Sequence, residues 1–419
     1  MVQSLIESVF RAESGRALAT VAAITHSLDL AEDAVQEAFV DALRSWADEG
    51  IPERPGAWIT TAARNRAIDR VRRESKRPQR EQLAQLTAAA EAAGAGPESA
   101  EDHELQLLFT CCHPALARPA RIALTLRLVF GLSAEEIARL VLDAEATVAQ
   151  RLSRAKAKIR NAGIPLRVPP RELFAERLPS VLSCIYLTFT EGYAPAAGDA
   201  VIRADLCRES IRLARLVHAV TPEDSEAEAL LALLLLQDSR RAARMDSAGS
   251  VIPIEDQDRD SWDKMKAQAG LAHLRSAAVR GHGPYLLQAV IACAHTMAPS
   301  FSQTDWATIV AAYDQLLYHQ DSPVVRLNRA IALGFRDGYT AGLEELDTLA
   351  ADTRLARSHI FHAARADLCR RAGRNTDAVR SYEEALRAVK NSAVRAFLER
   401  RLREVQSDSA PSTGDHSRI

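Results

Sequence analysis

The spacing of apolar side chains predicts a helix-turn-helix between Ser133 and Arg160. Ser133 and Glu136 form the Ser-x-x-Glu pattern of a capping box, which predicts the start of the first helix. A second apolar stripe then follows at steps of four, three and four residues, through Val148, Leu152, Ala155 and Ile159. These steps keep the stripe on one face of a second helix. Two helices joined in this way are typical of units that place the second helix in the DNA major groove.

The outer face of this second helix, predicted at residues 144–158, is polar and basic. It carries Thr147, Gln150, Arg154 and Lys158, with Arg151 at its edge. Side chains of these types can contact phosphates and base edges. The alternative is an ordinary helical hairpin with a solvated face. The choice between the two depends on the sequence upstream.

Two amphipathic helices of opposite charge precede this unit. In the first, at residues 31–43, we expect Val35, Phe39 and Leu43 to be buried, while the acids form a surface of Glu32, Asp33, Glu37 and Asp41. The second starts at Ala57, and eight basic residues stand against two acids between positions 64 and 80. One face of it carries Trp58, Asn65, Asp69, Arg72 and Lys76. Such a face could stack on bases and hold phosphates, or it could be a buried tryptophan on a solvated helix.

Composition restricts the class of protein. The 419 residues carry a formal net charge of −2, so any basic surface must be local. Helical periodicity recurs along the chain and predicts an all-α fold. The apolar run at 230–236 is too short to cross a bilayer, and the N-terminus lacks a signal-peptide pattern. Six cysteines without a Cys-x-x-Cys pair indicate a reducing compartment, so we expect a cytoplasmic protein outside the membrane.

Three stretches together resemble region 2 of the sigma-70 family, closest to its extracytoplasmic-function group: residues 30–39, 58–59 and 63–73. Residues 133–160, preceded by 124–132, are similar to region 4 of the same group. The order and spacing of the two motifs match that group. The resemblance implies partners: the RNA polymerase core, through its β′ clamp and β flap, and promoter DNA.

The resemblance also implies roles for particular residues. The acidic helix would bind the β′ clamp through Glu32, Asp33, Gln36 and Glu37. The loop 46–56 would take a base flipped from the −10 element, and the basic helix would hold the melted strand through Trp58, Asn65, Arg66, Arg70 and Arg73. The −35 element would be read by Thr147, Gln150, Arg151, Arg154 and Lys158. Ala149 departs from the family, which often has arginine in this slot.

The chain continues well beyond these two regions. We predict region 2 at 1–80, a flexible linker at 81–104, region 4 at 105–165, a helical extension at 166–285, helical repeats at 286–406 and a disordered tail at 407–419. A 36-residue offset relates the spacing of Ala366, Ala378, Tyr382 and Ala385 to that of Ala330, Gly342, Leu346 and Leu349. This spacing fits tetratricopeptide-like repeats forming an α-solenoid, with a looser copy at Ala294 and Trp306. The whole resembles a branch of extracytoplasmic-function sigma factors with such an extension.

Other patterns suggest chemistry less strongly. Residues 111–113 (Cys-Cys-His) lack a second ligand pair, so we expect packing and no metal. The acidic run 254–263 is more typical of a helix N-cap, at Asp258 or Asp260, than of a cation site. No catalytic constellation stands out, so we expect no enzyme, no catalytic residue and no cofactor.

Two alternatives to a sigma factor remain open. One is a helix-turn-helix regulator that does not join polymerase and has ligand- or protein-sensing repeats. The other is an enzyme or small-molecule sensor centred on Glu191, Asp256, Asp258 and Trp262. In either case the repeats are the candidate site for a protein or small-molecule partner.

Overall fold

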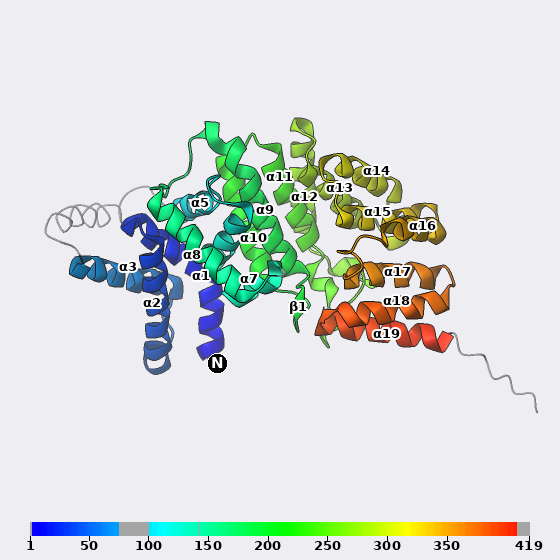
Figure 1. The fold of residues 1–419 in the computed structure, drawn as a ribbon, viewed down its shortest axis with the longest axis horizontal. Coiled ribbons are helices and arrows are strands. Elements are labelled where there is room, and N and C mark those ends of the chain that lie inside the picture. The colour runs from blue at the N-terminus through cyan, green and yellow to red at the C-terminus, as the bar shows by residue number, and fades with distance from the viewer. Residues whose placement is uncertain (1, 75–99, 142, 409–419) are drawn as a thin grey trace, which may run out of the picture. The chain divides into compact units, whose positions relative to one another are not determined.

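The computed structural model describes residues 2–74, 100–141 and 143–408 (Figure 1). The chain divides into two compact units: unit 1 comprises residues 1–191 and 204–220, and unit 2 comprises 192–203 and 221–419. Helices account for nearly all the regular structure of the described residues, so the predicted all-α class is confirmed. The exception is a two-residue parallel pairing in unit 2 of β1 (Ala197–Gly198) with β2 (Lys390–Asn391).

Unit 1 begins with three mutually packed helices, α1 (Val2–Thr25), α2 (Leu28–Glu49) and α3 (Pro55–Glu74). The hydroxyl of Ser27 caps α2 by accepting a hydrogen bond from the Leu30 N–H at 3.3 Å. Val35 and Phe39 are buried as predicted, but Leu43 is 46% exposed, so that prediction is wrong. Eight residues rotate a helix about 80° past its starting face. Trp46, only 2% exposed, lies on the buried face at this end of the helix.

Within residues 100–220 of unit 1, the described part of the chain forms six further α-helices. They are α5 (Ala100–Cys111), α6 (Arg118–Leu128), α7 (Ala134–Val141), α8 (Glu145–Asn161), α9 (Phe174–Tyr193) and α10 (Ala204–Val220), with a 3-10 turn at Arg171–Leu173. Helix α5 packs against α1, and α6 packs against α8. Since α5 starts at Ala100, the last part of the predicted linker, 100–104, is helical. Residues 81–99 of that linker lie outside the described residues, as does most of the predicted tail, whose positions 407–408 belong to the last helix.

The border between the compact units differs from the predicted domain border at 166. Helices α9 and α10 belong to unit 1 because they pack against its other helices. The rings of Phe109 and Phe174 stack with centroids 5.4 Å apart, and Arg212 of α10 contacts the buried Glu104 of α5 at 2.6 Å. The prolines between residues 165 and 170 therefore lie in a loop within unit 1.

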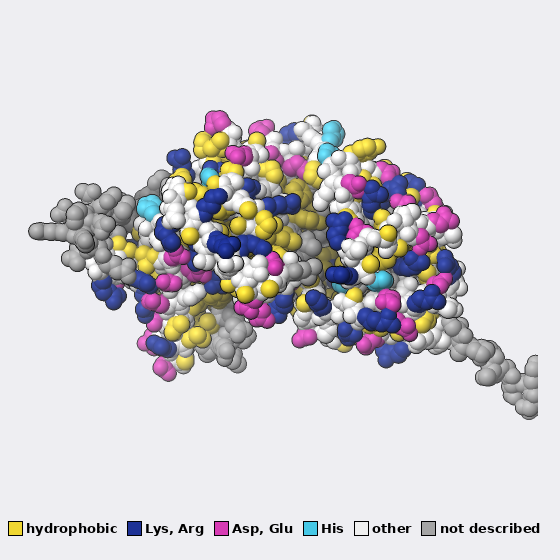
Figure 2. Space-filling view, in the orientation of Figure 1, with side chains coloured by type: hydrophobic (Ala, Val, Ile, Leu, Met, Phe, Trp, Pro, Cys, Tyr) yellow, Lys and Arg dark blue, Asp and Glu magenta, His cyan; other side chains and the backbone are white. Residues whose placement is uncertain are grey.

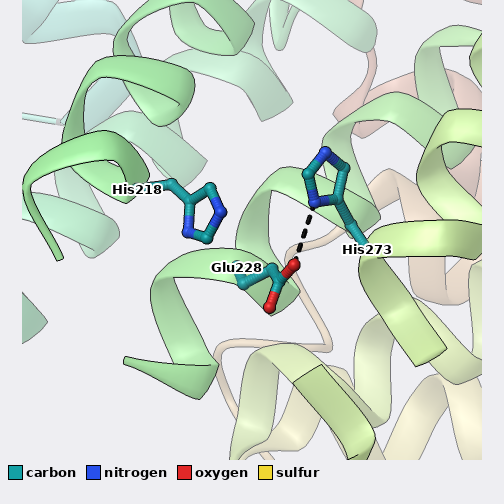
Figure 3. A group of neighbouring side chains, drawn as sticks. All are labelled: His218, Glu228 and His273. Atoms are coloured by element: carbon teal, nitrogen blue, oxygen red, sulfur yellow. Dashed lines mark hydrogen bonds and ion pairs between the residues drawn. The ribbon is translucent and has the colours of Figure 1, made fainter. Parts of the chain in front are cut away.

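Unit 2 is organised around α11 (Ser225–Asp238), in which every residue from Leu230 to Leu236 is at most 1% exposed. Helix α12 (Lys264–Arg280) packs along it, and Gly270 permits this approach: a Cβ there would meet the Leu236 side chain at 2.8 Å. His273 Nδ1 lies 3.0 Å from Glu228 Oε1 (Figure 3), and this contact connects the same two helices, α12 and α11. Glu228 also pairs with Arg280. His218, labelled in the same figure, belongs to α10 of unit 1.

Successive helix pairs form the rest of unit 2 (Figure 1). They are α13 (Pro284–Met297) with α14 (Trp306–His319), α15 (Pro323–Asp337) with α16 (Tyr339–Leu349), and α17 (His359–Arg371) with α18 (Asn375–Ala388), followed by α19 (Ser392–Asp408). The predicted repeat positions from Ala330 to Ala385 are buried. At Gly342 the helices approach too closely for a side chain, since a Cβ there would meet the backbone oxygen of Ala330 at 2.8 Å. The repeat spacing thus marks where paired helices touch.

Charged side chains of both signs are interspersed over α14–α19 on the face that Figure 2 shows. This face has no single-sign field of the kind that attracts nucleic acid. Among the described residues, no helix is both long enough and apolar enough to span a membrane.

Candidate nucleic-acid interface

The helix-turn-helix forms as its sequence predicts. The Ser133 N–H donates to Glu136 Oε2 at 2.8 Å, and the Glu136 N–H donates to Ser133 Oγ at 3.1 Å, which confirms the capping box. The predicted inner face of α8 is buried, at 0–8% exposure: Val148, Leu152, Ala155 and Ile159. On the outer face, Thr147, Gln150, Arg154 and Lys158 are exposed. The second helix therefore has a free polar face, the feature that major-groove binding requires.

Arg151 differs from its neighbours on α8. It is half-buried, and its Nη2 lies 2.7 Å from Asp143 Oδ2 in the turn between the helices. The hydrogen bond from Arg151 lowers the pKa of the Asp143 carboxyl. Arg151 thus links the turn to the second helix.

The basic helix α3 packs against the acidic helix α2, so the predicted polymerase-binding and DNA-binding side chains of these helices form one continuous surface. Arg66 Nη1 lies 3.0 Å from Glu37 Oε2, and its Nε donates to Asp41 Oδ2 at 2.7 Å. The hydrogen bond to Asp41 is the main reason that the pKa of Arg66 is raised. Arg70 Nη1 lies 3.1 Å from Asp33 Oδ2. The predicted polymerase-binding acids and the predicted DNA-binding arginines are therefore each other's partners in the free chain.

These pairs leave the surface available to another partner. The side chains of Arg66, Arg70, Asp33 and Glu37 are 41–52% exposed, and exposed pairs contribute only about 0–1 kcal/mol each. A phosphate could therefore replace the carboxylates, and a basic surface could replace the arginines. Gln36, Asn65 and Arg73 are also exposed, and Arg73 Nε donates to the backbone oxygen of Asp69 at 3.2 Å.

Trp58 has a partly structural role. Its ring lies edge-on to that of the buried Trp46, with centroids 5.4 Å apart and an interplanar angle of 68°. The side chain is half-buried, so one part packs against α2 while another reaches solvent. The packing of Trp58 against Trp46 supports the structural interpretation, and its role towards bases stays a prediction.

Glu32 is separated from the other predicted acids of α2. Its carboxylate lies 2.7 Å from Arg127 Nη2 of α6 and 3.0 Å from Lys156 Nζ of α8. Asp29, one turn earlier, contacts Lys156 at 2.9 Å and Arg160 at 2.5 Å. We call this group, Asp29, Glu32, Arg127, Lys156 and Arg160, the inter-region latch. It joins the segment that resembles region 2 to the segment that resembles region 4.

Burial alone would lower the pKa of Lys156, but the hydrogen bond that Lys156 donates to Asp29 and the charge of Glu32 outweigh burial and raise that pKa. Sequence reasoning missed the latch. Lys156 and Arg160 are one turn apart on the flank of α8, which is a visible signal, but their partners lie more than 120 residues away.

The conspicuous residues of the extension have structural partners. Asp258 is an N-cap, as predicted, but of the 3-10 turn Arg259–Ser261, whereas Asp263 caps the α-helix α12. The run turns twice before the helix begins. Trp262 is buried, with the guanidinium carbons of Arg259 and Arg240 at 4.5 Å and 5.8 Å from its ring centroid.

The Cys-Cys-His run packs at the end of α5. Cys111 and Cys112 are buried, and burial raises the pKa of the Cys111 thiol. His113 Nδ1 accepts a hydrogen bond from the Ala115 N–H at 3.1 Å. These contacts give all three residues a place in the fold of unit 1.

Comparisons with known proteins agree with this geometry. Sigma-70 region 2 matches residues 9–77, and sigma-70 region 4 matches residues 106–159. A family of unknown function, DUF6596, matches residues 177–278. The uncharacterized protein R00370 of Rhizobium meliloti (strain 1021) is 40% identical over 398 residues, which is 94% of each chain. No solved structure matches the chain. The chain therefore belongs to the sigma-70 family and has the two regions with which a sigma factor binds RNA polymerase and DNA.

Proposed function

We propose that this protein is an extracytoplasmic-function sigma factor, which directs RNA polymerase to particular promoters, and that its extension is a fused regulatory domain. The observation that supports this most is that one chain has both an exposed polar face on α8 and an exposed surface of acidic and basic side chains on α2 and α3. A regulator that only bound duplex DNA would have no use for the second surface. The protein would act in the cytoplasm and would carry out no covalent chemistry itself.

The proposed roles follow the two surfaces. Asp33, Gln36 and Glu37 of α2 bind the β′ clamp. The −10 strand is held along α3, where Trp58 and Asn65 contact bases and Arg66, Arg70 and Arg73 contact phosphates. The outer face of α8 reads the −35 element, through Thr147, Gln150, Arg154 and Lys158, with Arg151 at its edge.

The inter-region latch adds a conformational step to this proposal. Reading two separated promoter elements requires regions 2 and 4 to move apart, and the latch holds them together in the free chain. We propose that core polymerase binds the open form, so that the latch lowers the apparent affinity by the fraction of molecules that are closed. Glu32 then belongs first to the latch and becomes available to polymerase only on opening.

Run-off transcription tests the proposed function directly. The full-length protein is mixed with bacterial core polymerase and a template containing the DNA upstream of its own gene. We expect a discrete transcript that requires both the protein and the core. Tight duplex binding without a transcript would favour the conventional helix-turn-helix regulator.

A charge reversal separates the two classes further. Asp33→Arg with Glu37→Arg should abolish core binding and transcription, because it inverts the surface offered to the clamp. Binding to duplex DNA through α8 should be unchanged. Asp48→Arg, at an exposed acid on the same helix, is the matched control and should leave transcription intact. Loss of transcription in the control as well would contradict a specific acidic docking surface.

A further inference from the structure

Unit 2 contains a cavity of about 370 Å3 between its repeat helices and the segment 253–255. Side chains from α13, α14, α15, α17, α18 and α19 line it, together with Ile254 and Glu255. Pockets for small organic ligands range over about 300–1,000 Å3 and are mostly apolar with a few placed polar groups. This cavity has both properties.

One wall is aromatic and rigid. The rings of Trp306 and Phe335 stack with centroids 4.5 Å apart and an interplanar angle of 12°. Phe301 lies edge-on to both, at 5.6 Å and 5.3 Å, and His295 lies edge-on to Trp306 at 5.3 Å. Aromatic groups held by one another in this way lose little entropy when a ligand binds. The wall suits a ligand with a planar ring.

Two arginines form the polar edge of the cavity. The Arg371 guanidinium lies 5.0 Å above the Phe335 ring, pairs with Asp367 at 2.6 Å and also pairs with Glu255. Arg401 lies 3.6 Å from the other oxygen of Glu255 and 3.4 Å from Asp256. Their side chains are only 16–17% exposed. Burial alone would lower the pKa of Arg371, but the hydrogen bonds that it donates to Glu255 and Asp367 raise that pKa, so the group stays charged.

Glu255 reaches these arginines from a distant part of the chain. It lies in the 3-10 turn Ile254–Asp256, more than 110 residues before Arg371. Two carboxylates, Glu255 and Asp367, and two guanidinium groups line the cavity, so their charges balance. If Glu255 left, Arg371 would keep Asp367, and Arg401 would keep Asp256 and Glu404. An incoming carboxylate could then take over the contacts that Glu255 made with both guanidinium groups.

We propose that this cavity is a binding site for a small aromatic carboxylate, which takes the place of Glu255 on Arg371 and Arg401 and packs its ring against the Trp306–Phe335 wall. Glu255 is then an internal competitor for the ligand. Binding would release the 3-10 turn 254–256 from the repeats and so change the segment that leads into α12. The site concerns unit 2 alone, so it does not depend on the proposed sigma activity.

Isothermal titration calorimetry on the full-length protein tests the site, with 3-phenylpropionate as the probe and 3-phenylpropionamide as its neutral control. We expect the carboxylate to bind at least fivefold more tightly than the amide. Arg371→Met should abolish this preference. Arg336→Met is the matched control, because Arg336 is an exposed arginine of α15 that pairs with Asp337 instead.

Glu255→Gln is the decisive variant. It removes the competing charge, so the carboxylate should bind about tenfold more tightly while the amide is unaffected. Damage to the fold would weaken both probes and cannot produce this result. Equal affinities for carboxylate and amide, no tightening in Glu255→Gln, or no heat from either probe in that variant would overturn the proposal. Since the assay contains neither polymerase nor DNA, its outcome is separate from that of the transcription test.

Discussion

Weakening the inter-region latch should make the protein bind core polymerase more tightly. Lys156→Gln is the most informative change, because Lys156 contacts both Asp29, at 2.9 Å, and Glu32, at 3.0 Å, and is outside both proposed DNA- and polymerase-binding sets. Glutamine keeps much of the side-chain volume and removes the charge. The other latch contacts, Arg127 with Glu32 and Arg160 with Asp29, stay in place.

The magnitude follows from the exposure of the partners. Glu32 is 14% exposed and Lys156 is 22% exposed, so this pair should contribute about 1 kcal/mol, at the upper end for surface pairs. Asp29 is 43% exposed, and solvent screening reduces its pair with Lys156 to about 0.5 kcal/mol. Losing about 1.5 kcal/mol from the closed form shifts the equilibrium about tenfold towards the open form. While the closed form predominates, the apparent Kd should fall by the same factor.

The assay is the Kd of labelled full-length protein for purified core polymerase. Arg139→Gln is the control, since it breaks an exposed pair with Glu135 on α7, and its Kd should equal that of the wild type. Higher salt should narrow the difference between Lys156→Gln and wild type, because it screens the same charges. An unchanged or weaker affinity in Lys156→Gln, with a wild-type circular dichroism spectrum, would refute the latch.

Three further predictions concern stability. Burial raises the pKa of Glu104 to about 7, above that of an unfolded glutamate. The free energy of unfolding should therefore fall by up to about 3 kcal/mol as pH rises from about 4.5 through 7. Glu104→Gln should flatten this pH dependence in urea titrations, and an unaltered pH dependence in the variant would contradict the prediction. Gly342→Ala should destabilise the repeats by about 1–3 kcal/mol through its clash with Ala330, whereas the exposed Thr340→Ala should leave the melting temperature within a degree or two. Ser133→Ala should cost about 1 kcal/mol by removing one half of the capping box and should weaken duplex binding, so undiminished binding and stability would argue against that role.

Local patterns predicted the modules of unit 1 well. The capping box at Ser133, the buried stripe of α8 and its exposed outer face are all present, because each depends on residues within two or three turns of one another. Leu43 shows where the same reasoning fails. It is apolar and one turn from the buried Phe39, but two turns from Val35 the helix has rotated away from the core.

The candidate sites were harder to predict, because pairing partners come from distant segments. The acids of α2 and the arginines of α3 were each visible in the sequence, but the pairs of Arg66 with Glu37 and Arg70 with Asp33 depend on how the two helices pack. The same holds for the aromatic wall of the cavity. Trp306 and Phe335 are 29 positions apart and stack only because α14 and α15 are adjacent.

Local sequence patterns were enough to predict the helical class, the position of both sigma-70 regions and the repeat spacing in the extension. These properties depend on periodicity and short motifs, which act over distances of a few residues. Long-range packing, in contrast, places α9 and α10 in unit 1, pairs Glu32 with Arg127 in the inter-region latch and brings Glu255 to two arginines of unit 2. Ion pairs and stacked rings form between side chains that packing brings within a few ångströms. The free energy that selects those contacts belongs to the whole fold and to no single stretch of it.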